Sequence, residues 1–349
     1  MPARPLFEHD LDHVLDHTRH CWDEAKGASF FITGGTGFFG MWLLESFCHI
    51  NQRLNLGMSA TVLTRSPAAF AAKAPHLASE PCLQFLQGDV RNFKFPTESF
   101  QYLVHAATAA SAHLNDTAPH EMLNVIVQGT QHILEFAKHA GIQKLLLTSS
   151  GAVYGPQPAH LSHLSEDYLG APDPLLPASA YGEGKRVAEH LCCVHASQNA
   201  YEAKIARCFA FVGPHLPLDT HFAIGNFIRD VMQGDTVQVG GDGTPCRSYL
   251  HAADLAVWLW TILLQGKAGR AYNVGSEDSF TIGEVAALVA QIYKPPLKVA
   301  IAKQPEPGRP VQRYVPSTRR AKEELGLRTL IGPDAAIRQT IAWLTKGRS

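Results

Sequence analysis

Residues 28–40 read ASFFITGGTGFFG, and this stretch decides the fold. Ala28–Thr33 is a compact apolar run, which is typical of a buried strand. Gly34, Gly37 and Gly40 follow it, and a helix-like stretch, MWLLESFCHINQRL, comes next. Small residues let the backbone approach a pyrophosphate, and a helix N-terminus supplies free N–H groups and the positive end of a dipole. The order of strand, glycine turn and helix therefore predicts a dinucleotide phosphate site.

Outward from this turn, the chain alternates between strands and helices. Further apolar strands are expected at 58–63, 83–86, 102–105, 144–148 and 204–208. Helices are expected at 121–140 and 181–198, amphipathic helices around 253–265 and 281–293, and a last helix near 333–345. Continuous apolar strands alternating with helices indicate a parallel sheet that is covered on both faces. We therefore expect an α/β fold with a Rossmann-type doubly wound parallel sheet.

The length of 349 residues predicts about two domains. Residues 1–27 are expected to form an N-terminal helical extension. Residues 28–208, with about 244–275, are expected to form the dinucleotide-binding Rossmann domain, which recruits a later strand around 247–250 or 271–274. The segments left over, 209–243 and 276–349, are expected to form a smaller, interleaved C-terminal substrate-binding domain.

Composition narrows the classes of partner. Hydrophobic residues make up 46% of the chain, so a sizeable core can form. Lys+Arg is 30 and Asp+Glu is 31, a balance that disfavours nucleic acid and membrane surfaces as partners. No signal peptide, CxxC pair or apolar run of about 18 residues is found, and the seven cysteines are therefore expected to be reduced thiols in a cytoplasmic protein. His9, His13 and His17 fall four apart, but nothing completes a ligand shell, so no metal is expected.

The ends of the second and third strands suggest which cofactor is bound. NAD-specific folds place an acid at the end of the second strand to hold the ribose 2′-hydroxyl. Here Arg65 and Ser66 stand there, and a guanidinium and a hydroxyl suit a 2′-phosphate. This favours NADP, with NAD possible as the alternative. Asp89, after the third strand, could accept a hydrogen bond from the adenine amino group or could simply be a turn residue.

A tyrosine and a lysine four residues apart suggest the chemistry. Tyr181 and Lys185 share one helix face, so the ammonium is expected to lower the tyrosine pKa and prepare it for proton transfer with an alcohol or ketone. Gly182 and Gly184 disfavour a helix, which points to close approach of a ligand. Ser150, at the end of the fifth strand, could hydrogen-bond the reacting oxygen.

Together these motifs resemble the extended short-chain dehydrogenase/reductase family, the nucleotide-sugar epimerases and dehydratases. The resemblance covers roughly residues 28–330 and rests on motifs that occur in order: TGGTGFFG, GDV, VHAA, SSGAVYG, YGEGK, RCFAFVGP, GDGTPCRSYLHAADLA and YNVGS. It implies a homodimer formed through two helices of each chain, about 119–140 and 181–198. It also implies a nucleotide-diphosphate sugar as the substrate.

The resemblance assigns roles to individual residues. It implies a catalytic set of Ser150, Tyr181, Lys185 and Asn124. It implies that the cofactor is bound by Gly34, Thr36, Gly37, Phe38, Phe39, Gly40, Arg65, Ser66, Asp89, Val90, His105, Ala106, Ala107, Tyr181 and Lys185. It implies a substrate set of Ser150, Asn226, Arg247 and Arg309, in which two arginines suit a diphosphate because each can donate two parallel hydrogen bonds.

Departures from the family's sequence pattern indicate which reaction types are favoured. Sugar-nucleotide dehydratases usually carry an acid directly after the catalytic Ser or Thr, whereas Gly151 and Ala152 stand there in this chain. Ala210 stands where many relatives have Asn. We therefore expect an enzyme acting at C4 of a nucleotide-diphosphate sugar, first an epimerase and alternatively an NADPH-dependent 4-keto-sugar reductase. A dehydratase, a decarboxylase or a non-catalytic NAD(P)-binding protein is favoured less.

Overall fold

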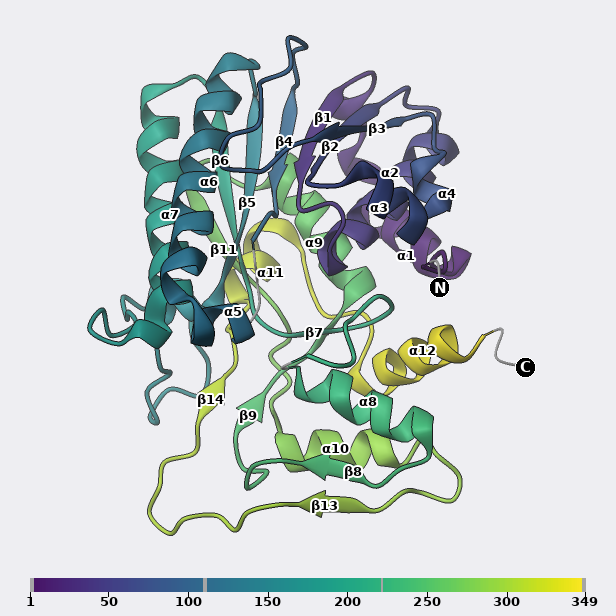
Figure 1. Ribbon diagram of the computed structural model, residues 1–349, viewed down its shortest axis with the longest axis vertical. Coiled ribbons are helices and arrows are strands. Elements are labelled where there is room, and N and C mark those ends of the chain that lie inside the picture. Colours follow the sequence, from purple (N-terminus) through teal and green to yellow (C-terminus); the bar gives the residue numbers. More distant parts are fainter. Residues whose placement is uncertain (1–2, 109–111, 221, 347–349) are drawn as a thin grey trace.

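A seven-stranded parallel sheet forms the centre of the molecule in the computed structural model (Figure 1). The structure describes residues 3–108, 112–220 and 222–346. The predicted domains also include residues 1–2, 109–111, 221 and 347–349, which lie outside the described residues. In sheet order the strands are β11 (Arg270–Val274), β6 (Glu202–Cys208), β5 (Lys144–Ser150), β4 (Tyr102–His105), β1 (Ser29–Thr33), β2 (Ser59–Thr64) and β3 (Leu83–Gln87). The predicted doubly wound α/β fold is confirmed, and β11 is the late strand that the sheet recruits.

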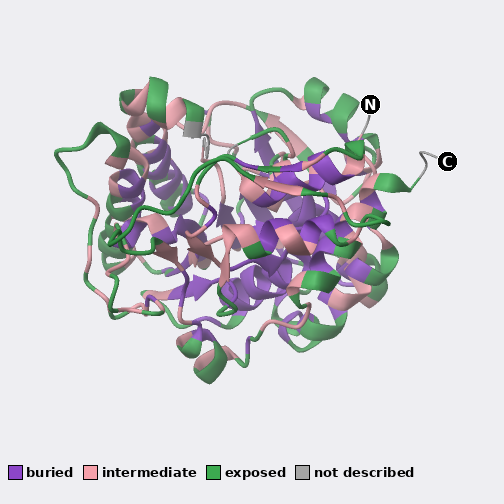
Figure 2. Cartoon of the chain, turned by 90° about the horizontal axis from the view of Figure 1, so that it is seen from below, coloured by how far each residue is buried: buried purple, intermediate pink, exposed green. Residues whose placement is uncertain are grey.

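Helices cover both faces of this sheet because its strands are apolar on both sides. Phe30 and Phe31 are neighbours in β1, and consecutive strand residues point to opposite faces. Phe30 packs into the cluster that contains α2 (Phe38–Leu54) and α9 (Ala252–Gln265), whereas Phe31 packs with α6 (Pro119–His139) and α7 (Ala180–Gln198). Figure 2 shows the buried residues gathered in this interior and the exposed ones along the outer loops.

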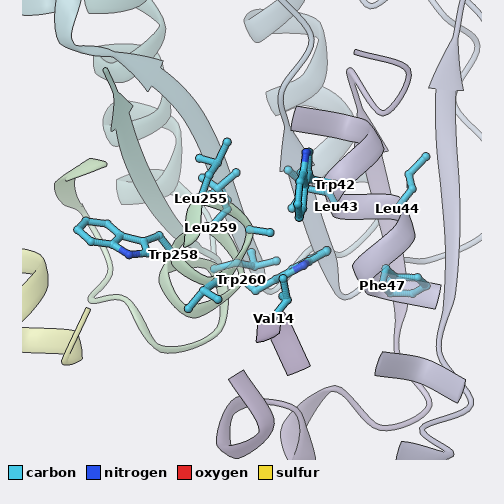
Figure 3. Close-up of a cluster of buried hydrophobic side chains, with 14 of the residues drawn as sticks. Val14, Trp42, Leu43, Leu44, Phe47, Leu255, Trp258, Leu259 and Trp260 are labelled. Atoms are coloured by element: carbon cyan, nitrogen blue, oxygen red, sulfur yellow. The ribbon is translucent and has the colours of Figure 1, made fainter. Parts of the chain in front are cut away.

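Helix α9 differs from its amphipathic prediction because it is buried all round. Every residue from Ala252 to Leu264 is buried. Figure 3 shows Trp258 and Trp260 of this helix in the cluster that also holds Trp42 of α2 and Val14 of the N-terminal helix. A helix that is apolar on every side belongs in a core. The Trp260 indole N–H donates to the Ser46 hydroxyl at 2.9 Å, so its polar atom is satisfied there.

The N-terminal segment is bound to three other parts of the chain. Its helix, α1 (Glu8–Thr18), is followed by two short 3-10 turns, η1 (Arg19–Cys21) and η2 (Asp23–Ala25). His13 Nε2 lies 2.8 Å from a carboxylate oxygen of Asp254 in α9. The Leu6 N–H donates to Glu45 of α2 at 2.6 Å, and the Trp343 indole of α12 (Pro333–Thr345) donates to the Pro5 carbonyl at 2.9 Å.

A second body of elements lies below the carboxyl ends of the strands (Figure 1). Its own apolar cluster joins α8 (Ala223–Gln233), β8 (Val237–Val239), α10 (Ile282–Ala290) and α12. Helix α8 was not predicted from the sequence, although its apolar residues Ile224, Phe227, Ile228 and Val231 recur at helical spacing. Smaller sheets pair β8 with β13 (Val299–Ile301), β7 (Phe211–Val212) with β10 (Leu250–His251), and β9 (Cys246–Arg247) with β12 (Phe280–Thr281) and β14 (Arg313–Tyr314).

Short elements complete the chain. They are α3 (Pro67–Lys73), α4 (Pro75–Ala78), α5 (Ala112–Thr117), η3 (Gly151–Tyr154), η4 (Pro177–Ser179) and α11 (Arg319–Leu325). Among the described residues, no helix combines the length and the apolar character that crossing a lipid bilayer requires.

Replacing Asp254 by alanine should destabilise the fold. Its carboxylate is fully buried and accepts hydrogen bonds from the backbone N–H groups of Leu330 and Ile331 at 2.8 and 3.0 Å, besides its contact with His13. Leaving buried donors without an acceptor should cost at least about 2 kcal/mol of unfolding free energy, which urea denaturation followed by tryptophan fluorescence would measure. Arg338→Ala removes an exposed ion pair and should cost less than about 1 kcal/mol, and equal losses in both variants would contradict the prediction.

Candidate functional site

A cavity of about 1350 Å³ opens at the carboxyl ends of the central strands. Open α/β sheets bind their ligands at this edge. Pockets that bind one drug-sized ligand measure about 300–1,000 Å³, so this larger volume suits two ligands placed end to end. The walls come from the turn after β1, from the ends of β2, β4 and β5, from the start of α7, and from the segments around residues 209–224 and 245–249.

The glycine turn brings its backbone close to one wall of the cavity. Gly34 has a φ of +74°, and a Cβ atom built on it would lie 2.4 Å from the Ala106 backbone at the end of β4. Helix α2 starts directly after Gly37, and no side chain caps its first N–H groups. Those groups are therefore available to an anion, as the sequence predicted. The cavity lining in this region comprises Gly34, Thr36, Gly37, Phe38, Phe39, Ala106 and Ala107.

Arg65, Ser66, Asp89 and Val90 line the far end of the cavity, where the sequence places the adenosine. The Ser66 hydroxyl caps α3 by accepting a hydrogen bond from a backbone N–H at 3.2 Å. The Asp89 carboxylate accepts three hydrogen bonds from Arg91, at 2.8 to 3.0 Å, and this guanidinium holds the pKa of Asp89 below its usual value. Its predicted role towards adenine stays a prediction.

Two cationic side chains at this far end of the cavity, Arg91 and Lys73, were not predicted from the sequence. Arg91 also donates to Glu121 at 2.7 Å, and both side chains line the cavity. Lys73, at the end of α3, donates from Nζ to the Thr36 carbonyl of the glycine turn at 2.8 Å, and burial lowers its pKa. No motif marks either residue: Lys73 reaches the turn through α3, and Arg91 is held at the cavity by Asp89 and by Glu121 of α6.

Tyr181 and Lys185 stand on one face of the first turns of α7, as their spacing predicts, and both line the cavity. Lys185 is buried, and its ammonium donates to the Thr108 hydroxyl at 2.6 Å and to the Thr148 carbonyl at 2.8 Å. Burial lowers the pKa of Lys185 to about 8. Thr108, which no motif indicated, is therefore the side chain that holds the lysine in place.

The expectation that Lys185 lowers the pKa of Tyr181 is wrong for this arrangement. Burial raises the pKa of Tyr181 to about 12, and the hydrogen bond with Ser150 offsets only part of that effect. The Lys185 nitrogen lies 6.0 Å from the centre of the tyrosine ring. Loss of water around the phenolate outweighs this distant charge.

Ser150 ends β5 and lies between two tyrosines. Its hydroxyl accepts a hydrogen bond from the Ala152 N–H at 3.1 Å and lies 3.4 Å from the Tyr314 hydroxyl of β14. The Tyr314 ring lies 4.6 Å from the Phe209 ring and 5.9 Å from the Arg247 guanidinium, centre to centre. Tyr314 was not predicted, because it approaches Ser150 from 164 residues further along the chain.

Gly151, which follows Ser150, leaves space that other side chains of the protein occupy. A Cβ atom on Gly151 would lie 2.7 Å from both the Phe209 ring and the Tyr314 hydroxyl. The sequence analysis noted that Gly151 lacks a dehydratase's acid. The structure adds that the Phe209 ring and the Tyr314 hydroxyl occupy the space into which a side chain at residue 151 would extend. Ala152 lines it without adding a polar group.

Two predicted cofactor residues lie behind the cavity and do not line it. Gly40 supports the turn, since a Cβ there would lie 2.2 Å from the Gly35 backbone. His105 is buried between Thr33 Oγ1, 2.8 Å from its Nδ1, and Thr130 Oγ1, 3.3 Å from its Nε2. Burial lowers the pKa of His105 to about 3, so the ring stays neutral.

Three further predicted residues are not brought to the cavity. Asn124 lies on α6 with its amide 3.3 Å from the His120 ring, and Asn226 of α8 donates to a backbone carbonyl at 3.1 Å. Arg309 is exposed and pairs with Glu306 at 3.4 Å. Arg247 alone among the predicted sugar-nucleotide arginines lines the cavity. The roles of Asn124, Asn226 and Arg309 stay predictions without support from this geometry.

Comparisons with known proteins agree with this architecture. The model of the NAD dependent epimerase/dehydratase family matches residues 30–275. UDP-glucuronic acid decarboxylase 6 of Arabidopsis thaliana is 30% identical over 295 residues, which are 84% of this chain and 82% of that protein. UDP-glucuronic acid decarboxylase 1 of Xenopus tropicalis is 28% identical over 316 residues, or 90% of this chain and 72% of that protein.

Solved structures share the fold. UDP-glucose 4-epimerase from Thermotoga maritima, solved with UDP-glucose, superimposes with a TM-score of 0.75 at 19% identity, covering 92% of this chain and 100% of that one. MoeE5 in complex with UDP-glucuronic acid and NAD gives a TM-score of 0.73 at 24% identity, covering 91% and 99%.

Replacing Gly151 by alanine should impair both stability and turnover. The added methyl group would push Phe209 and Tyr314 away from Ser150, and overpacking of this kind costs about 1–3 kcal/mol. Thermal unfolding and activity on the same preparation measure the two effects. Gly240→Ala is the control, because a Cβ there meets nothing within 4 Å. Unchanged turnover in Gly151→Ala would refute the tight contact.

Acid should destabilise the protein partly through His105. The pKa of His105 is about 3 in the folded state, below the usual value of 6.5. Its contribution to the free energy of unfolding is therefore complete above pH 6.5 and is lost progressively as the pH falls below 6.5. Urea midpoints at about pH 8 and about pH 5 should therefore differ less in His105→Gln than in the native protein. The control is His160→Gln, at an exposed histidine, which should show the same difference between the two urea midpoints as the native protein. A native difference in both variants would contradict the prediction.

Proposed function

The chain belongs to the NAD dependent epimerase/dehydratase family, and we propose that it oxidises C4 of a nucleotide-diphosphate sugar at the Ser150–Tyr181–Lys185 site. One observation carries the proposal. The three side chains converge at one end of a cavity whose other end begins at an uncapped helix N-terminus behind a glycine turn. This arrangement suits a dinucleotide and a second, anionic ligand that meet at Tyr181.

The residues present fit a nicotinamide dinucleotide. Gly34 leaves open the space that a side chain would fill, and the first N–H groups of α2 have no side-chain cap. Arg65 and Lys73 line the far end, and the end of β2 carries no acid. We therefore propose NADP as the preferred cofactor, with NAD as the alternative. When bound, the nicotinamide takes up and returns a hydride.

The chain's own residues move and hold the proton. In oxidation, Tyr181 accepts the proton of the C4 hydroxyl, and in reduction it returns that proton to the ketone. Ser150 donates a hydrogen bond to the same oxygen, and Tyr314 keeps the Ser150 hydroxyl in position. Lys185, held by Thr108, supplies positive charge beside the pair. Because the pKa of Tyr181 is about 12, its resting form is the proton donor, and added positive charge must favour the phenolate for oxidation.

The small number of carboxylates in the cavity lining restricts the reactions that a 4-keto sugar can undergo there. Among the described lining residues the acids are Asp89 and Glu121, and both pair with Arg91 at the far end. Eliminating water requires a base at C5 and an acid at the leaving hydroxyl. No described residue that lines the cavity near Tyr181 offers a carboxylate for either role, which disfavours a dehydratase.

Decarboxylation of a nucleotide hexuronate is the reaction that we propose. A 4-keto uronate carries its own carboxylate next to C5, one carbon from the ketone carbon. Its C–C bond can break to release carbon dioxide, and the electron pair passes to an enolate at the C4 oxygen, where Ser150 and Tyr181 donate hydrogen bonds. The enolate then returns to the ketone as C5 takes up a proton from water, so no protein carboxylate is needed for this step. The two curated relatives named above, both UDP-glucuronic acid decarboxylases, support the same reaction.

C4 epimerisation, the reaction ranked first from the sequence, is the second candidate. It needs no carboxylate either, because the ketone only has to present its other face to the hydride. That rotation requires space around the sugar, and Phe209 and Tyr314 take up the space beside Gly151. Reduction of a 4-keto sugar rests on the NADP preference alone and ranks third.

A homodimer through α6 and α7 remains part of the proposal. Val187 and Val194 lie seven residues apart on α7, and therefore on one helix face, and are 39% and 40% exposed; a second copy of the chain packed on this face would bury both.

A substrate panel tests the proposal. The purified protein is incubated with UDP-glucuronic acid, UDP-glucose and UDP-galactose, each with NAD or NADP, and with a UDP-4-keto-6-deoxy sugar and NADPH, and products are identified by mass spectrometry. We expect loss of carbon dioxide from UDP-glucuronic acid. Tyr181→Phe should lower that turnover by about 10²–10⁴-fold, whereas Tyr293→Phe, on an exposed residue, should leave it unchanged.

The other outcomes separate the alternatives. Interconversion of UDP-glucose and UDP-galactose without carbon dioxide release would replace decarboxylation by epimerisation. Net consumption of NADPH with the keto sugar would replace it by reduction. Turnover that survives Tyr181→Phe would overturn the assigned site itself.

A further inference from the structure

Two cysteines meet on the side of the sheet that carries the far end of the cavity. Cys48 lies on α2, and Cys82 lies just before β3, the edge strand. Their sulfur atoms are 3.6 Å apart and share a hydrogen bond. Both side chains are half-buried, unlike the buried Cys192 and Cys208. A small thiol reagent can therefore reach this pair.

The electrostatics of the pair favour one reactive sulfur. The hydrogen bond with Cys48 lowers the pKa of Cys82 to about 7, whereas the same bond and burial raise the pKa of Cys48. The thiolate is the attacking form of cysteine. Glu80 lies within 4.8 Å of both sulfur atoms, and its charge raises the pKa of each. A neutral disulfide would relieve this crowding of negative groups.

The two cysteines lie at the ends of a segment of the chain that lines the cavity. The two cysteines are 34 positions apart, and the chain between them forms β2, α3 and α4. That segment brings Arg65, Ser66 and Lys73 to the cavity wall. A covalent bond between its ends would close a loop around this group of residues and restrict its opening.

We propose that Cys48 and Cys82 are a modification site that closes to a reversible intramolecular disulfide by exchange with a small disulfide such as oxidised glutathione. The sulfur atoms must approach from 3.6 Å to about 2.05 Å. This requires a local shift of the side chains at the end of α2 and in the turn at residues 80–82. The proposal does not depend on the function argued above.

The exchange balances in two steps. The Cys82 thiolate attacks one sulfur of the small disulfide, a mixed disulfide forms, and one small thiolate leaves. The Cys48 thiolate then attacks the Cys82 sulfur, the protein disulfide forms, and the second small thiolate leaves. In total, two protein thiols are oxidised, one small disulfide is reduced to two thiols, and the protons pass to those thiols.

A metal ion is the competing occupant. Cys48, Glu80 and Cys82 could offer three ligand atoms. Structural zinc sites are almost always four-coordinate, and in the described part of the chain no fourth His, Cys or carboxylate joins the group. The geometry therefore favours the disulfide, and zinc becomes an outcome of the test.

The experiment is a thiol map of the full chain. The protein is purified under reduction, exposed to oxidised glutathione, alkylated and digested without reduction, with and without added zinc. We expect a peptide that links Cys48 to Cys82, loss of two alkylatable thiols, and their return after dithiothreitol. Cys48→Ser and Cys82→Ser should each abolish the link, whereas Cys193→Ser, at an exposed cysteine, should retain it.

Two results would overturn the proposal. The first is a map in which oxidised glutathione modifies Cys193 while Cys48 and Cys82 both remain alkylatable. The second is stoichiometric zinc on the purified protein that protects both thiols from oxidation and alkylation. The wild-type map decides the matter even if a serine variant does not fold.

Discussion

The close approach of the first glycine turn to the end of β4 is the constraint on which the rest of the structure depends. Gly34 takes a φ of +74°, and no Cβ fits between it and the Ala106 backbone. This contact starts α2 at the edge of the cavity. The same helix then holds the opposite wall, because the Trp42 indole donates to the Pro214 carbonyl at 2.9 Å and Glu45 lies 3.1 Å from the His215 ring. One turn and the helix that follows it thereby position two facing parts of the cavity wall.

A buried polar network supports the catalytic end from below. Glu189 of α7 pairs with Arg207 of β6 at 2.7 Å and accepts a hydrogen bond from the Ser149 hydroxyl of β5 at 2.5 Å. Arg207 donates to the Tyr154 hydroxyl at 2.9 Å, which donates to Asn273 of β11 at 2.7 Å. Burying such charges contributes little net stability, since their desolvation offsets their attraction. The network instead fixes the relative positions of the strand that ends in Ser150 and the helix that carries Tyr181 and Lys185.

Burial then sets the acid–base character of that end. Burial disfavours the charged form of Lys185 and of Tyr181, so their pKa values move apart, to about 8 and about 12. Aromatic rings fill the place in which a dehydratase's acid would stand. The described residues that line this end of the cavity offer hydroxyls and one ammonium but no carboxylate, and such a lining suits a substrate that carries its own carboxylate, which is why we place decarboxylation ahead of epimerisation.

The sequence by itself determined the parallel sheet, the glycine turn and the pairing of Tyr181 with Lys185. Each of these depends on residues close together in the chain, where strand alternation and helix periodicity dictate which side chains share a face. Only the tertiary structure decided that Tyr314, Thr108 and Lys73 belong to the cavity, and that the predicted Asn124, Asn226 and Arg309 do not line it. It also decided the pKa of Tyr181, which depends on how much water the packed elements exclude. Contacts between distant segments and the solvent around them follow from how the elements pack, and residue spacing carries no record of that packing.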